Sequence, residues 1–82
     1  MTVMLRYWAA AAAATGVDVE EAAPGAVASV LADAVLRHPD LARILDVASV
    51  LLDGVPVRAG AREETRAEGG STLEVLPPFA GG

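Results

Sequence analysis

One stretch near the middle of the chain has the repeat of an amphipathic helix. Its apolar residues follow the i, i+3, i+4, i+7, i+8 spacing that gives a helix one apolar face: Val27, Val30, Leu31, Ala34 and Val35. Pro24 stands in a position suited to open this helix, and Pro39 predicts an end at His38, because a residue before proline avoids the α region. The chain has 82 residues, so a single domain must form around this helix.

The residues before the helix alternate with a period of two, as strands do. In residues 2–8 the alternation puts Val3, Leu5 and Tyr7 on one face, which we expect to face the core. Residues 17–20 alternate again and predict a second strand, antiparallel to the first. The alanines between them, residues 9–14, are too few for an independent helix, so we expect a turn or two of helix, or a loop, packed on the body.

A short helical turn and a hairpin are predicted after the helix. We expect Asp40 to cap a turn over residues 41–45, whose apolar side chains would lie under the sheet. Residues 47–52 predict a strand, and the Asp53-Gly54 pair that follows is typical of a type I′ turn. Pro56 restricts the strand after the turn to an edge of the sheet, because proline has no N–H to donate.

The end of the domain combines a polar stretch with a last strand. Residues 58–70 contain no large apolar side chain, so we expect a solvated loop that covers no core, with one helical turn as an option. Residues 71–76 predict a strand with Leu73 and Val75 on one face.

This order of elements predicts an α+β fold. A mixed sheet of about five strands would pack on one main helix, with the first and last strands paired in parallel through the helical crossover. That pairing places the last strand in the middle of the sheet. We therefore expect a domain over residues 1–76 and a flexible C-terminal tail over residues 77–82.

The tail has the sequence Pro77-Pro78-Phe79-Ala80-Gly81-Gly82. The prolines end the strand and favour an extended course, and six residues span roughly 20 Å. Glycines without Cβ atoms fit a narrow channel in a partner, which would bring the carboxylate of Gly82 to its reaction site. The alternative is a frayed chain end, but such ends are usually polar. We interpret Phe79 as an anchor in a partner's pocket; the alternative is packing against the chain's own sheet.

Charge and composition exclude several classes of function. The net charge is −5 and the chain contains no lysine, which argues against nucleic-acid and anionic-membrane partners and suits a basic protein. Without cysteine there is no disulfide, thiolate metal site or thiol nucleophile, as in a reducing cytoplasm. No segment has the roughly 20 apolar residues of a membrane span. Residues 1–15 share features with a secretion signal, but alanine makes a weak signal core and residues 2–8 alternate like a strand.

Few side chains are candidates for chemistry. We assign His38 no role beyond a helix cap or a surface position, and we expect the pairs Glu20-Glu21 and Glu63-Glu64 to be solvated rather than acid–base dyads. One set of charged residues is expected to pair on the surface: Arg58, Arg62 and Arg66 with Glu63, Glu64 and Glu68.

Two large side chains of the first strand predict a contact surface. Met4 and Trp8 would lie on the face opposite Leu5, where exposed apolar groups mark a partner interface. In the alternative, the alanine segment folds over Trp8.

With this arrangement and ending, the chain resembles the ubiquitin-like sulfur carriers of the MoaD/ThiS family, and among them the small subunits of molybdopterin synthase. The opening strand that ends in Arg6-Tyr7-Trp8-Ala9, the Asp53-Gly54 turn and the tail carry the resemblance. It implies a ubiquitin-like β-grasp fold.

The resemblance also implies a reaction cycle in which the chain is a carrier and not an enzyme. A MoeB-like activating enzyme would use ATP and Mg²⁺ to adenylate the Gly82 carboxylate, and a sulfur donor would convert it to a thiocarboxylate. A MoaE-like large subunit would then receive the tail, residues 77–81 included, and pass the sulfur to cyclic pyranopterin monophosphate. The chain itself would bind no cofactor or metal.

Three alternatives remain open at this point. They are a sulfur carrier for thiamine or cysteine synthesis, a protein modifier joined to lysines through Gly82, and a structural module whose tail is incidental.

Overall fold

A computed structural model describes residues 1–78 of the chain. Its elements in chain order are β1 (Val3–Tyr7), α1 (Ala10–Thr15), β2 (Val19–Ala22), β3 (Gly25–Ala26), α2 (Val27–Arg37), α3 (Leu41–Leu45), β4 (Ser49–Leu52), β5 (Val55–Pro56), the 3₁₀ turn η1 (Ala59–Ala61), β6 (Arg66–Ala67) and β7 (Thr72–Leu76). The fold class is α+β, as predicted.

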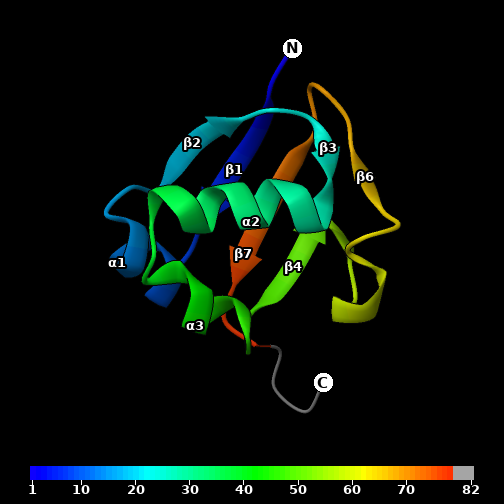
Figure 1. The fold of residues 1–82 in the computed structure, drawn as a ribbon. Helices are drawn as coiled ribbons and strands as arrows, with labels where there is room; N and C mark the ends of the chain where they lie inside the picture. The colour runs from blue at the N-terminus through cyan, green and yellow to red at the C-terminus, as the bar shows by residue number, and fades with distance from the viewer. Residues whose placement is uncertain (79–82) are drawn as a thin grey trace.

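The main sheet has the strand order β2-β1-β7-β4-β5. β1 and β7 run parallel, while the other neighbours are antiparallel. α2 crosses one face of this sheet on the way between its two halves (Figure 1). The predicted parallel pairing of first and last strands is therefore confirmed, and β7 is the middle strand.

The core lies between the sheet and α2. Val3, Leu5 and Tyr7 of β1 are buried, as are Leu73 and Val75 of β7, so the predicted inward faces of both strands are confirmed. They meet the buried side of the helices: Val27, Val30, Leu31 and Ala34 of α2 and Leu41 of α3. The clearest helix of the sequence thus provides one wall of the core.

The hairpin between β4 and β5 has the predicted turn. Asp53 and Gly54 have φ values of 50° and 83°, the positive values that a type I′ turn requires at both central residues. The carboxylate of Asp53 accepts a hydrogen bond from the Thr72 backbone N–H at 2.9 Å, which ties the turn to β7. β5, with Pro56, lies at the sheet edge as expected.

The start of α2 differs from the prediction. Pro24 does not open the helix, because Gly25–Ala26 first pairs with Arg66–Ala67 in a small second sheet. The helix then begins at Val27, and its first N–H groups donate to backbone carbonyls of the 58–70 segment, Val27 to Thr65 and Ala28 to Arg62, both at 2.8 Å. This segment therefore caps the helix with its backbone.

Three further expectations were wrong. The 58–70 segment does contribute to the core, since Ala67 is fully buried. β2 begins at Val19, two residues later than the alternation from residue 17 indicated. Asp40 makes no side-chain capping bond to α3; instead the Leu41 N–H donates to the His38 carbonyl at 2.9 Å.

The turn at Gly54 can be tested by a matched pair of glycine substitutions. A Cβ at Gly54 would meet no atom within 4 Å, so the cost of Gly54→Ala comes from its positive φ alone. We expect it to lower the free energy of unfolding by about 1 kcal/mol in urea titrations. Gly60→Ala, equally uncrowded and without a positive φ, is the control and should be neutral or slightly stabilising. Equal losses in both variants would contradict the turn assignment.

Candidate functional site

The tail begins where the middle strand of the sheet ends. β7 stops at Leu76, and Pro77 and Pro78 continue from it as exposed residues. This end of β7 lies beside α3 (Figure 1). The sequence placed the site itself on Phe79, Ala80, Gly81 and Gly82, which lie outside the described residues, so those assignments stay predictions.

An apolar pocket of about 200 Å³ lies at the base of the tail. Three parts of the chain form it: residues 8–11 at the end of β1 and start of α1, the segment around α3 with Ile44, Val47 and Ala48, and residues 76–78. We call it the tail-base pocket. Small alanine side chains leave this space open, because larger residues on α1 would fill it.

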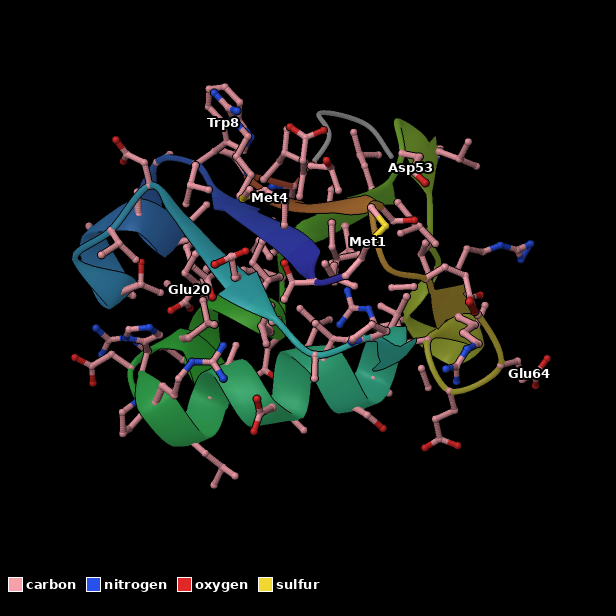
Figure 2. The ribbon with its side chains drawn as sticks, turned by 90° about the horizontal axis from the view of Figure 1, so that it is seen from above. Met1, Met4, Trp8, Glu20, Asp53 and Glu64 are labelled. Carbon is pink, nitrogen blue, oxygen red and sulfur yellow. The ribbon has the colours of Figure 1, made fainter. Side chains whose placement is uncertain are left out.

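Trp8 and Met4 lie on the sheet face away from α2 (Figure 2). Their exposed fractions are 42% and 38%. The indole N–H of Trp8 donates to Glu74 Oε2 at 2.9 Å, and the Arg6 guanidinium lies 5.1 Å from the centre of the ring. The alanine segment therefore flanks Trp8 without burying it, and the predicted apolar surface is present.

One cluster of titratable groups was not predicted. Glu20 of β2 (Figure 2) accepts a hydrogen bond from the Tyr7 hydroxyl. His38 Nε2 lies 3.0 Å from Glu20 Oε2, and Arg37 Nη2 lies 3.5 Å from the same oxygen. The expectation that Glu20 is simply solvated was wrong. His38 is the C-cap of α2, as expected, with its N–H donating to the Ala34 carbonyl at 2.8 Å, and its side chain also contacts Glu20.

The environment of this cluster shifts the pKa values of Tyr7, Glu20 and Arg37, the last of them upward. Burial, and then the hydrogen bond to Glu20, raise the pKa of the Tyr7 hydroxyl well above its ordinary value. Burial alone would raise the pKa of Glu20, but hydrogen bonds from Tyr7, His38 and Arg37 together lower it. The Glu20 carboxylate thus connects β2 to β1 and to the end of α2, so its role is to stabilise the fold.

The arginines of the 58–70 segment pair less than expected. Arg66 contacts Glu68, as predicted. Arg62 instead has its Nη2 3.5 Å from the Ala48 carbonyl, and within residues 1–78 its buried Nε lacks a hydrogen-bond partner. Among the described residues no group of three or more His, Cys, Asp or Glu side chains could hold a metal ion. In the same part of the chain no helix is both long and apolar enough to span a bilayer.

A comparison with protein families gives the decisive observation: the profile of the ThiS family matches residues 5–82. The chain belongs to the ThiS family. These are ubiquitin-like sulfur carriers, also described as MoaD/ThiS-like. The match extends through the tail to Gly82. No curated protein matches this ThiS-family chain.

Solved structures share its fold. The small archaeal modifier protein 1 of Methanosarcina acetivorans superposes with a TM-score of 0.84 at 20% identity, over 99% of this chain and 96% of that one. The putative molybdopterin converting factor subunit 1 of Pyrococcus furiosus gives 0.77 at 20% identity, over 96% and 99%. A chain in the complex of subunits 1 and 2 of the Helicobacter pylori molybdopterin-converting factor gives 0.70 at 18% identity, over 100% of both. The predicted ubiquitin-like β-grasp fold is confirmed.

The Glu20 cluster predicts a pH-dependent stability. Because the folded-state pKa of Glu20 lies below the ordinary value of 4.5, its carboxylate stabilises the fold above that pH, and this contribution is lost as the pH falls further. Near pH 7, Glu20→Gln should lower the free energy of unfolding by about 1–3 kcal/mol, and the deficit should shrink near pH 3. Urea titrations at both pH values measure this. Glu63→Gln, at an exposed position, is the control; a Glu20→Gln deficit that is the same at both pH values would refute the assignment.

Proposed function

We propose that this ThiS-family chain is the small subunit of a molybdopterin synthase and carries sulfur as a thiocarboxylate on Gly82. One observation carries the proposal: the match to the ThiS family includes Gly82, and in the structure the central strand β7 continues directly into Pro77 and Pro78 at the start of the tail. Pro77 and Pro78 continue from the middle strand as exposed residues, so the tail starts outside the core. We place the cycle in the cytoplasm, because a chain without cysteine suits a reducing compartment in which disulfides are rare.

The chemistry explains why the carrier needs an activating partner. A carboxylate is a poor electrophile at neutral pH. In the proposed cycle a MoeB-like enzyme with ATP and Mg²⁺ joins the Gly82 carboxylate to AMP and releases pyrophosphate. Hydrosulfide released from a sulfur donor then attacks the acyl carbon, the bond from that carbon to the AMP oxygen breaks and a proton is released, so that AMP leaves and the thiocarboxylate remains. ATP and Mg²⁺ belong to the partner, and the carrier binds neither.

The carrier's own side chains support this division of labour. Small ubiquitin-like carriers of this family are generally non-catalytic. Within residues 1–78, the groups around Glu20 are partly buried, bond to one another and join β1 and β2 to the end of α2, whereas the tail leaves beside α3. We therefore assign catalysis to the partners and only the acyl carbon of Gly82 to this chain.

We propose a MoaE-like large subunit as the receiving partner. The Helicobacter pylori structure is a complex of subunits 1 and 2 of the molybdopterin-converting factor, and its similarity supports a large-subunit partner here. On this chain the surface formed by Met4, Trp8 and the base of the tail would contact that subunit, with Phe79 as an anchor and Ala80, Gly81 and Gly82 in its channel. Apolar groups at the tail's origin suit such a contact.

A second candidate function is that of a protein modifier joined to lysines. The superposition on a small archaeal modifier protein favours keeping it. Gly-Gly remnants on lysines of other proteins after protease digestion would support it. Co-purification with a thiazole synthase or a cysteine synthase would instead indicate a carrier for thiamine or cysteine synthesis.

The thiocarboxylate is tested by intact mass. Incubation with the activating enzyme, ATP, Mg²⁺ and a sulfide source should add about 16 Da, because sulfur replaces one oxygen of Gly82. A variant that lacks Gly82 is the control for the position of the modification and should gain nothing if the enzyme requires the final glycine. An unchanged mass of the intact chain under these conditions would count against the proposal.

The contact surface is tested by binding to the large subunit. Trp8→Ala removes the largest exposed apolar group near the tail and should weaken binding at least about tenfold, as loss of an aromatic anchor does. Leu36→Ala removes a side chain that is 81% exposed on α2 and should leave affinity unchanged. Calorimetry measures both, and equal effects of the two substitutions would remove Trp8 from the interface.

A further inference from the structure

The lining of the tail-base pocket favours an apolar occupant. Its lining side chains are apolar, apart from the indole N–H of Trp8, and that group already donates to Glu74 at 2.9 Å. A cavity holds water well only when it offers about two to four polar partners. The side chains around this pocket offer none that is free, so an apolar group would be favoured over water there.

The size of the pocket matches an aromatic ring. Its volume is about 200 Å³. An apolar cavity of about 150 Å³ is enough to bind benzene. A phenyl ring therefore fits, and the partly exposed side chains of Ile44 and Ala48 form a wall for it.

The chain has one phenylalanine, and it follows the last residue of the pocket wall. Pro77 and Pro78 line the pocket, and Phe79 is bonded to Pro78. Consecutive Cα atoms are about 3.8 Å apart, so the backbone of Phe79 has to start at the rim. Because both prolines have a fixed φ, few torsions are ordered when the ring enters.

We propose that in the free chain the phenyl ring of Phe79 occupies the tail-base pocket and packs against Trp8, Ile44 and Ala10. The connection to Pro78 selects this occupant over a second copy or a partner's side chain, since both of those would have to associate from solution. The pocket thus serves as an internal docking site for the base of the tail.

This contact gives Phe79 two alternative positions. It lies in its own pocket while the chain is free and leaves it when a partner takes up the tail, a step that rests on the proposed function. The apparent affinity for the partner is then reduced by the fraction of chains in which the ring is withdrawn. The docking itself does not depend on any sulfur chemistry, so the two proposals fail separately.

Nuclear magnetic resonance on the full chain tests the contact. Because Phe79 is the single phenylalanine, ring-labelled phenylalanine reports on this residue alone. We expect nuclear Overhauser effects from its ring to the methyl groups of Ile44 and Ala10. Phe79→Ala should shift the Ile44 methyl signals and the emission of Trp8, the single tryptophan. Leu36→Ala, on the exposed side of α2, should change none of these.

A blocking variant separates docking from folding. Ala10 is exposed and lines the pocket, so Ala10→Leu should fill the space and abolish the ring contacts to Ile44, while amide signals of β1 and β7 stay in place. The proposal is overturned if the ring shows no contact to Ile44 in the free wild-type chain. It is equally overturned if contacts arise only between differently labelled copies, or only after the large subunit is added.

Discussion

The parallel pairing of β1 with β7 determines the rest of this structure. Leu5 and Leu73 lie opposite each other in this pair and are both fully buried. Parallel neighbours require a crossover, and α2 provides it, so the helix lies against the strands whose inward faces it covers. The same pairing leaves β7 bonded on its other side to β4, and it brings the start of the tail beside α3 and the end of β1.

Much of this arrangement could be predicted from periodicity. The alternation in β1 and β7, the apolar stripe of α2 and the Asp53-Gly54 turn each rest on local patterns that the tertiary structure preserves. The parts that could not be predicted depend on small residues or on distant backbone. β3 and β6 have two residues each, so they show no period, and Ala67 is buried because a methyl group fits where the segment passes close to α2. The start of α2 depends on carbonyls of residues 62 and 65, which local sequence does not reveal.

In the candidate site, too, some features could be predicted from the sequence and others could not. The outward direction of Met4 and Trp8 follows from the alternation that buries Leu5, and it was predicted. The cluster around Glu20 was not predicted, because its partners are distant in the sequence: Tyr7 lies 13 positions before Glu20 and His38 lies 18 positions after it. The cluster also needs the register that sets Glu20 opposite Leu5. The tail-base pocket was also missed, since it is a space that alanines leave between α1 and α3, and an alanine run gives no signal of what lies beside it.

The position of β7 also affects how the domain responds to traction. A pull on the start of the tail acts on a strand flanked by β1 and β4, whose ladders lie on both of its sides. A pull along the strand loads the hydrogen bonds of both ladders in shear, so many of them have to break together, whereas an edge strand can peel off one bond at a time. The domain can therefore be held by its last strand without unravelling, and the two prolines after Leu76 mark where its two ladders end.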